Sequence, residues 1–259
     1  MKHRLDHLLL QKRLVPTRSQ AESYIRLGQV KVDGKVIQKP GYFVNPEANI
    51  EFGVKEQYVS RAALKLASVD KLLGLNFRQK IVLDVGSSTG GFTDYALQNS
   101  AKRVIAIDVG TNQLHPRLRN DPRVELHEKT DIRSVFIQKT EPGGKSQELA
   151  KNDRIFINES PDIVLIDVSF ISMTKILPHI STLITHDSQI VAMLKPQFEA
   201  GKNQLNKGVV KNSKQRREIL QKFELWCREN NFVILKKSDS AVAGEKGNVE
   251  RFYLLGKLM

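Results

Sequence analysis

The chain has 259 residues and a formal net charge of +13, from 41 Lys and Arg against 28 Asp and Glu. Hydrophobic residues make up 40% of it, which is enough for a folded core and argues against a disordered chain. The longest unbroken apolar run, Ile190 to Leu194, is far shorter than the roughly 20 residues of a membrane-spanning helix, and no secretion signal is visible. A basic chain of this kind favours a polyanionic partner, most often nucleic acid, although the charge could serve solubility alone.

Residues 1–53 predict a small α+β unit. Apolar residues follow helical spacing over residues 3–11 and 18–27, with Thr17 as the cap of the second helix and Gly28 as its stop. Residues 30–36 alternate around Asp33-Gly34, as in a β-hairpin, and residues 50–52 favour a last strand.

This first unit is also basic, with nine Lys or Arg against five Asp or Glu. From charge alone, a solvated surface and a phosphate-binding face fit equally well. The stretches Arg4-Leu5-Asp6-His7-Leu8-Leu9 and Thr17 to Gly34 resemble the RNA-binding fold named after small-subunit ribosomal protein four. The resemblance implies RNA binding through the helix pair, for which the candidate contacts are Lys2, Arg4, Lys12, Arg13, Arg18, Arg26 and Lys31.

From Ser60 onward, predicted strands and helices alternate. Ser60 is expected to cap a helix. Apolar runs predict strands at residues 81–83, 104–107, 124–126, 163–166, 190–194, 232–235 and 252–255. Seven strands interleaved with helices indicate a doubly wound, mostly parallel sheet covered on both faces. The polar stretch 137–160 predicts a loop insertion. We therefore expect an RNA-binding domain at 1–53, a linker at 54–59 and an α/β domain at 60–259.

The strongest local motif runs from Asp84 to Asp94, directly after a predicted strand. Glycines let the backbone turn sharply and approach a ligand closely. Gly91 is followed by Phe92 instead of Lys, which excludes an ATPase phosphate loop, and Ser88 stands where a dinucleotide fingerprint needs its second glycine. The spacing G-x-x-x-G-G, with an acid two residues earlier, is typical of S-adenosylmethionine-binding sheets, and a plain structural turn is the alternative.

The predicted cofactor site extends to the ends of the next two strands. Asp108 is placed to accept hydrogen bonds from ribose hydroxyls. Asp131 is placed to contact adenine or, equally, to cap a helix. The full set of predicted cofactor contacts is Asp84, Gly86, Ser88, Thr89, Gly90, Gly91, Phe92, Asp108, Val109 and Asp131.

Four charged residues farther apart make chemical sense as a set: Lys65, Asp167, Lys195 and Glu250. Taken singly, each could form an ordinary ion pair. Because the carboxyl ends of parallel strands meet at one edge, Asp84, Asp108, Asp167 and Lys195 should converge on one crevice. Methylation of a hydroxyl requires removal of its proton, and a lysine can accept that proton only if its pKa falls from about 10.4 toward 7–8. Burial and a second lysine both favour this shift.

Together, the motifs resemble the TlyA family, which joins a ribosomal-protein-like RNA-binding domain to an FtsJ-type ribose methyltransferase. The resemblance is carried by Tyr58–Leu66, Asp84–Asp94, Ala106–Leu114, Asp121–Val124, Asp162–Ser172, Lys195–Gly201, Lys207–Val210 and Gly247–Glu250. The family's Lys-Asp-Lys-Glu tetrad falls on Lys65, Asp167, Lys195 and Glu250. It implies a Rossmann-like class I methyltransferase that uses S-adenosylmethionine on ribose 2′-hydroxyls of ribosomal RNA, free or in ribosomal subunits.

Within that family scheme, Lys195 is the base, Asp167 orients it, and Lys65 and Glu250 position the ribose. Thr111 and Asp131 depart from the aromatic residue and the Asn expected at their positions. Two alternatives remain: a ribosome-assembly factor without turnover, and a haemolysin, a label that some family members carry. No apolar span supports a pore.

Cysteine and histidine usage gives two further expectations. The single cysteine, Cys227, excludes an internal disulfide and predicts a reducing, cytoplasmic setting. The six histidines lack the spacing of metal ligands, so no metal site is expected.

Overall fold

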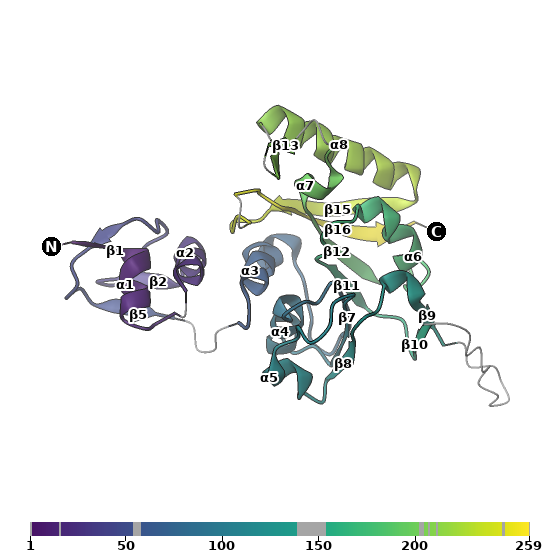
Figure 1. Cartoon of the computed structure of the whole chain (residues 1–259), viewed down its shortest axis with the longest axis horizontal. Coiled ribbons are helices and arrows are strands. Elements are labelled where there is room, and N and C mark those ends of the chain that lie inside the picture. Colours follow the sequence, from purple (N-terminus) through teal and green to yellow (C-terminus); the bar gives the residue numbers. More distant parts are fainter. Residues whose placement is uncertain are drawn as a thin grey trace.

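The computed structural model describes residues 2–15, 17–53, 58–138, 154–201, 205–206, 208–210, 212–244 and 247–258. Its helices are α1 (Leu5–Gln11), α2 (Arg18–Arg26), α3 (Arg61–Leu73), α4 (Gly91–Gln98), α5 (Pro116–Arg119), α6 (Leu177–Ile180), α7 (Pro196–Glu199), α8 (Ser213–Glu229) and the 3₁₀ turns η1 (Ile132–Ser134) and η2 (Met173–Lys175). A small N-terminal unit stands beside a larger α/β unit (Figure 1).

A seven-stranded sheet forms the centre of the larger unit, in the order β15-β16-β12-β11-β6-β7-β8. Its strands are β6 (Ile81–Val85), β7 (Arg103–Ile107), β8 (Val124–His127), β11 (Ile163–Ile166), β12 (Gln189–Leu194), β15 (Phe232–Asp239) and β16 (Arg251–Lys257). Only β16 runs antiparallel to its neighbours in this sheet, so the expected mostly parallel sheet is confirmed. The first strand, β6, lies between β7 and β11, which makes it a topological switch point where open α/β sheets bind ligands.

Helices cover both faces of this sheet. On one face, α3, α4 and α5 bury Leu66, Tyr95 and Leu118 against the strands. On the other face, α6 and α8 bury Leu177 and Phe223. The two hydrophobic cores hold the strands rigidly, so residues at the strand ends have fixed relative positions.

The N-terminal unit packs α1 and α2 on short strands. These are β2 (Val30–Val32), β3 (Lys35–Val36) and β5 (Ile50–Phe52) in one sheet, with β1 (His3–Arg4) and β4 (Phe43–Val44) as a separate pair. Thr17 accepts a hydrogen bond from the Gln20 amide, as its predicted cap role requires. The predicted start of the first helix is wrong: His3 and Arg4 form a strand because their backbone pairs with Val44 and Phe43.

The two units touch through α3. Leu64, on the face of α3 away from the sheet, packs into the N-terminal core together with Val242. The Arg61 guanidinium bonds Ser19 of α2, and the Val59 amide donates to Asp94 of α4 over 2.8 Å. Residues 54–57 of the expected linker lie outside the described residues.

The expected loop at 137–160 is partly a strand. Strand β10 (Ile155–Ile157) pairs in parallel with β9 (Val135–Ile137), and Ile157 is buried in the core. The strand was not predicted because polar residues surround it, although Ile155 and Ile157 alternate as in a strand with one buried face. Residues 139–153 lie outside the described part, and a short hairpin, β13 (Leu205–Asn206) with β14 (Val209–Val210), precedes α8.

Candidate active site

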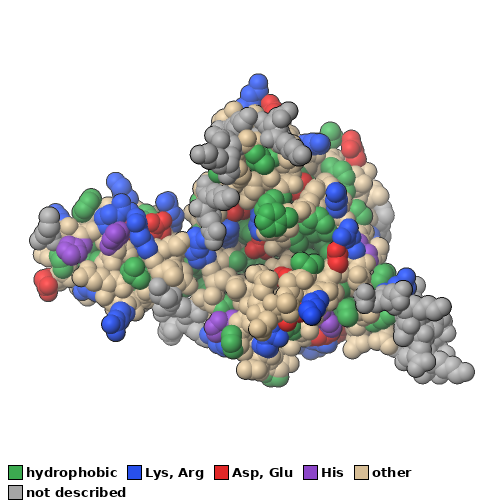
Figure 2. All heavy atoms as spheres, in the orientation of Figure 1, with side chains coloured by type: hydrophobic (Ala, Val, Ile, Leu, Met, Phe, Trp, Pro, Cys, Tyr) green, Lys and Arg blue, Asp and Glu red, His purple; other side chains and the backbone are tan. Residues whose placement is uncertain are grey.

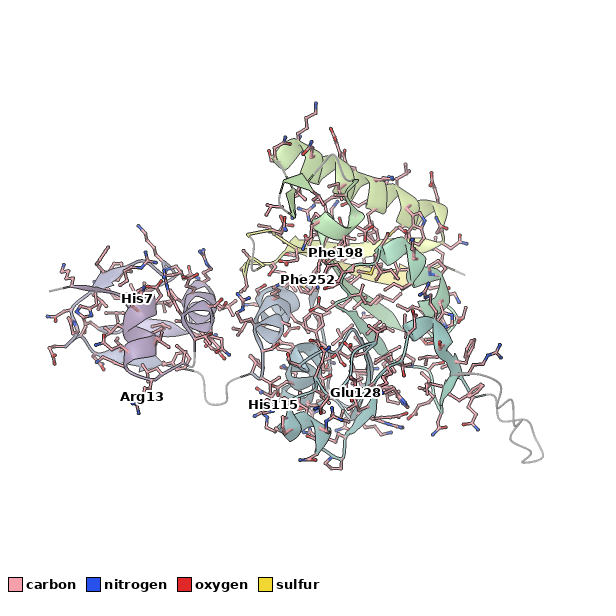
Figure 3. All side chains as sticks on the ribbon, viewed as in Figure 1. His7, Arg13, His115, Glu128, Phe198 and Phe252 are labelled. Atoms are coloured by element: carbon pink, nitrogen blue, oxygen red, sulfur yellow. The ribbon has the colours of Figure 1, made fainter. Side chains whose placement is uncertain are left out.

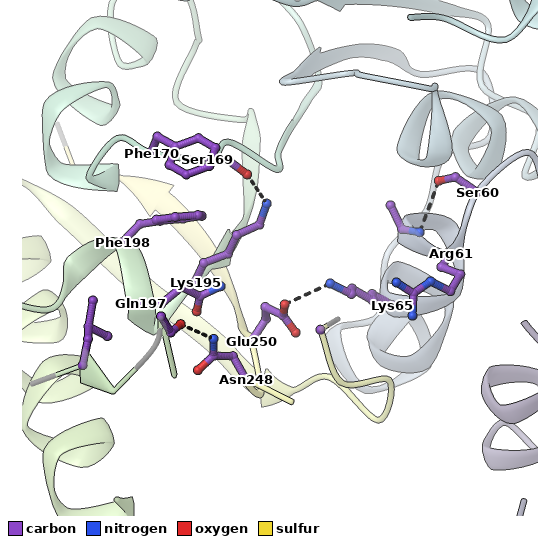
Figure 4. A pocket seen from close by; sticks show the side chains of 14 residues that line it. Ser60, Arg61, Lys65, Ser169, Phe170, Lys195, Gln197, Phe198, Asn248 and Glu250 are labelled. Carbon is purple, nitrogen blue, oxygen red and sulfur yellow. Dashed lines mark hydrogen bonds and ion pairs between the residues drawn. The ribbon is translucent and has the colours of Figure 1, made fainter. Parts of the chain in front are cut away.

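Four charged side chains that are distant in sequence form two ion pairs at one edge of the sheet. Lys195 Nζ lies 2.6 Å from Asp167 Oδ1, and Lys65 Nζ lies 2.9 Å from Glu250 Oε1. Lys65, Lys195 and Glu250 line one cleft of about 670 Å³ (Figure 4). Asp167 lines the small cavity next to this cleft, together with Lys195. The fold therefore brings the whole predicted tetrad together.

The elements explain how the pairs form. Asp167 directly follows β11 and Lys195 directly follows β12, and these parallel strands are neighbours. Lys65 comes from α3, and Glu250 precedes β16, which is the other neighbour of β12. All four side chains are at most 17% exposed, so each charge depends on its partner.

Three side chains hold the Lys195 ammonium group. Besides its ion pair with Asp167, Nζ donates to Ser169 Oγ over 2.9 Å and lies 5.9 Å from the centre of the Phe198 ring. These contacts keep the lysine pointing into the cleft instead of into solvent.

The glycine turn lies beside this cleft. A cavity of about 150 Å³ is lined by Asp84, Thr89 and Gly91 from the turn and by Asp167 and Lys195. Three of the four residues expected to share one crevice, Asp84, Asp167 and Lys195, do so. The fourth, Asp108, lies in an adjoining cavity that also contains Asp167.

Asp84 is the most perturbed carboxyl group of this region. It is fully buried, and Thr93 Oγ1 donates to its Oδ2 over 2.6 Å, while Oδ1 has no hydrogen-bond partner among the described residues. Burial raises the pKa of Asp84 to about 7; the nearby Asp167 and Asp108 raise it as well, and the Thr93 hydrogen bonds oppose the shift. A buried acceptor without a partner, at the wall of a cavity, is a feature of a site for a polar ligand.

Gly86 and Gly90 are needed in the turn for different structural reasons. Gly86 has a φ of +84°, and a Cβ there would lie 2.7 Å from the Asp167 carbonyl oxygen. Gly90, with a φ of +92°, is the N-cap of α4, and it lines neither cavity because it faces Leu114 and Leu118. Phe92 borders the small cavity, but its side chain is buried against Phe252, so only its backbone can meet a ligand there.

The adjoining cavity, of about 440 Å³, combines carboxylates with apolar walls. Asp108 accepts hydrogen bonds from the Ser88 amide (2.8 Å) and the Gly110 amide (2.6 Å), and Val109 lies next to it. Asp131 lines the cavity and also caps η1, with its carboxylate held by Arg133. Both predicted roles of Asp131 thus have a geometric basis. Thr111, the other departure from the family pattern, is exposed and does not line the cavity.

Ser60 and Phe170 line the large cleft but were not in the predicted set of site residues; from the sequence, Phe170 fits a cleft wall or core packing equally well. Ser60 was expected only to cap α3, yet it also borders both the cleft and the small cavity. Phe170 is 91% exposed, has a φ of +64° and contacts Phe198 with ring centres 4.9 Å apart. An exposed aromatic residue held in the left-handed region is strained, and such strain is typical of functional positions. No sequence pattern signals this exposure.

The predicted RNA contacts of the N-terminal unit have exposed or partly exposed side chains. Figure 2 shows Lys and Arg gathered along the upper side of this unit. Arg4 and Arg18 both pair with the buried Asp6, and each stays 40–46% exposed. Arg13 lies at the opposite end of α1 from His7 (Figure 3). The others, Lys2, Lys12, Arg26 and Lys31, are all exposed.

Within the described ranges, the structure contains neither a cluster of metal-binding side chains nor a helix that could span a membrane. No group of three or more metal-binding side chains is assembled there. None of the helices described has the length and apolarity to cross a membrane.

Comparison with known proteins identifies the family. A family model described as FtsJ-like methyltransferase matches residues 58–257, and a model of the S4 domain matches residues 3–50. The 16S/23S rRNA (cytidine-2'-O)-methyltransferase TlyA of Mycobacterium tuberculosis is 33% identical, over 97% of this chain and 89% of the relative. This chain belongs to the TlyA family of FtsJ-like methyltransferases.

Other TlyA relatives carry a different name. Hemolysin A of Brachyspira hyodysenteriae is 35% identical, over 95% of this chain and 97% of the relative. A solved structure of a hemolysin from Streptococcus thermophilus matches with a TM-score of 0.67 and 35% identity, over 99% of this chain and 89% of that one.

The family-model matches and the Mycobacterium tuberculosis relative confirm the family and the class I methyltransferase fold predicted from the sequence. The chain is a methyltransferase.

Proposed function

We propose that this protein methylates ribose 2′-hydroxyls of ribosomal RNA, with S-adenosylmethionine as the donor and Lys195 as the base. The observation that carries the proposal is the two Lys–carboxylate ion pairs that lie at the large cleft and at the small cavity beside the glycine turn. The relative in Mycobacterium tuberculosis is named as an rRNA (cytidine-2'-O)-methyltransferase, which supports an rRNA substrate and a cytoplasmic location.

The residues around the glycine turn suit the donor. Asp84 has an acceptor without a partner and a carboxyl group that an ammonium ion would keep charged, which fits the amino group of the donor. Asp108 has lone pairs beyond its two amide bonds for ribose hydroxyls, and Ile132 and Val168 supply apolar walls for adenine. When bound, S-adenosylmethionine supplies a methyl group on a positively charged sulfur.

The tetrad suits a hydroxyl acceptor. Lys195 Nζ would take the proton of the ribose hydroxyl as that hydroxyl accepts the methyl group. Asp167 and Ser169 hold Nζ at the cleft, and Glu250 keeps Lys65 in place to orient the ribose.

Phe170 suits the base of the target nucleotide. Its exposed ring stands where the large cleft and the Asp108 cavity meet, within ring contact of Phe198. Stacking on such a ring would place the attached ribose toward Lys195. We propose that residues 1–53 bind the surrounding RNA, and that residues 60–259 form the methyltransferase domain after a linker at 54–59.

The test is methyl transfer by purified protein to deproteinised rRNA and to ribosomal subunits, with the product mapped by mass spectrometry. Lys195→Met should lower the rate by about 10²- to 10⁴-fold while donor binding by calorimetry is retained. Lys71→Met, on the exposed side of α3, is the matched control and should keep the wild-type rate. Transfer to neither substrate would reject the proposal in favour of an RNA-binding factor without turnover, and an unchanged Lys195→Met rate would reject the base.

A further inference from the structure

The N-terminal unit presents an exposed aromatic ring beside its arginines. Phe43 is 60% exposed, while its neighbour Val44 is buried. In the antiparallel pair β1–β4, Phe43 stands directly opposite Arg4. Directly opposed residues project from the same face with Cβ atoms about 5 Å apart, so Phe43 and Arg4 belong to one surface.

Arg4 is held in place on this surface. Its Nε and Nη2 donate to the two carboxylate oxygens of Asp6 over 3.0 and 2.7 Å, and Arg18 Nε donates to the same carboxylate over 3.0 Å. A Cβ at Gly41 would lie 3.4 Å from the Arg4 guanidinium, so the turn before Phe43 passes beside this group. Burial raises the pKa of Asp6, but the hydrogen bonds from Arg4 and Arg18 outweigh it and lower the pKa to about 2.

Arg18 Nε also lies 3.3 Å from Glu22 Oε1, so the two guanidinium groups share the carboxylates of Asp6 and Glu22. Both arginine side chains stay 40–46% exposed, so they can still meet an anion. A fixed cation beside an exposed ring matches a nucleotide, which has a phosphate and an apolar base face. A duplex hides its base faces, so the ring needs an unpaired base.

We propose that Phe43 is a stacking surface for an unpaired RNA base whose neighbouring phosphates bind Arg4 and Arg18. This proposal rests on the RNA binding proposed above for residues 1–53 and names the kind of RNA that the β1–β4 surface takes. The proposal also adds an uncharged residue, Phe43, to predicted RNA contacts that are all Lys or Arg.

The test compares two fluorescent RNA probes with the full-length protein: a single-stranded 12-mer and a fully paired duplex of equal length. Phe43→Ala should weaken binding of the single strand about tenfold, leave duplex binding unchanged and keep the salt dependence, because stacking releases no counterions. Phe43→Trp should restore binding. Val36→Ala removes another exposed apolar side chain of the same unit, from the other sheet, and should change nothing.

Arg18→Ala separates stacking from charge, since Arg4 still pairs with Asp6 in this variant. It should weaken binding of both probes and reduce the salt slope by about one phosphate contact. If Arg18→Ala has this effect and Phe43→Ala has none, or weakens both probes equally, the stacking proposal fails and RNA binding stands. If wild-type protein binds neither probe, both fail. Binding to phosphatidylglycerol vesicles that Phe43→Ala abolishes, with RNA affinity unchanged, would assign Phe43 to a lipid surface and overturn the proposal.

Discussion

Asp84 makes the stability of this protein depend on pH in a way that a single substitution removes. Its carboxyl group is fully buried, and its pKa rises from 3.8 to about 7. The folded state therefore favours the protonated form. Because the folded pKa lies above the unfolded one, this contribution to stability is complete below pH 3.8 and is lost as the pH rises through about 7.

The magnitude follows from the shift. About three pKa units at 1.36 kcal/mol each correspond to about 4 kcal/mol between pH 4 and pH 8. This is a large part of the 5–15 kcal/mol that typically stabilises a domain. The asparagine of Asp84→Asn cannot ionise. The free energy of unfolding of Asp84→Asn, relative to that of the wild type, should therefore increase by about this amount from pH 4 to pH 8.

The assay is urea unfolding of both proteins at pH 4, 5.5, 7 and 8, since subtracting the two curves cancels every other titrating group. Thr93→Val removes the hydroxyl that stabilises the ionised carboxylate of Asp84, so the pKa of Asp84 should be higher in this variant. The pH-dependent loss of stability caused by Asp84 should then continue to a higher pH than in the wild type. In the same pH range, binding of S-adenosylmethionine to wild-type protein should tighten as Asp84 ionises, and Asp84→Asn should lose that dependence. A stability difference that stays constant from pH 4 to 8 would refute the reasoning.

Three further outcomes are expected. Phe170→Ala should raise the KM for RNA about tenfold with donor affinity unchanged, measured by steady-state kinetics; an equal loss of donor affinity would mean that the ring supports the cofactor cavity instead. Ser169→Ala removes one of the groups that hold Lys195, so the rate should fall about fivefold, the worth of one hydrogen bond; a loss as large as that of Lys195→Met would give Ser169 a direct part in the chemistry. Asp6, whose depressed pKa stabilises the fold above pH 3.8, should make the N-terminal unit lose stability as the pH falls toward 2. Asp6→Asn should show a lower melting temperature at pH 7 and no such loss on acidification.

Three members of the tetrad could be found from the sequence because Asp167, Lys195 and Glu250 end or precede strands that are easy to recognise, whereas Lys65 lies on α3. Asp167 and Lys195 each follow an uninterrupted apolar run, and neighbouring parallel strands bring such ends together. The family resemblance implied that Asp167 orients Lys195, but the ion pair between Lys65 and Glu250 was not predicted, because it depends on β16 inserting next to β12 and a one-dimensional pattern contains no strand order. Sequence reasoning also missed β10, whose two isoleucines are too few to stand out from polar surroundings.

What the sequence determined by itself is local: the helix cap at Thr17, the hairpin turn at Asp33-Gly34, the glycine bend and the seven strands. These follow from backbone preferences and from the period of apolar residues, which act between near neighbours. The tertiary structure alone decided that Asp84 is sealed from water, that Phe170 is left exposed and that Phe43 stands opposite Arg4. Burial and cross-strand contact depend on which distant segments pack together, so no short stretch of sequence contains them.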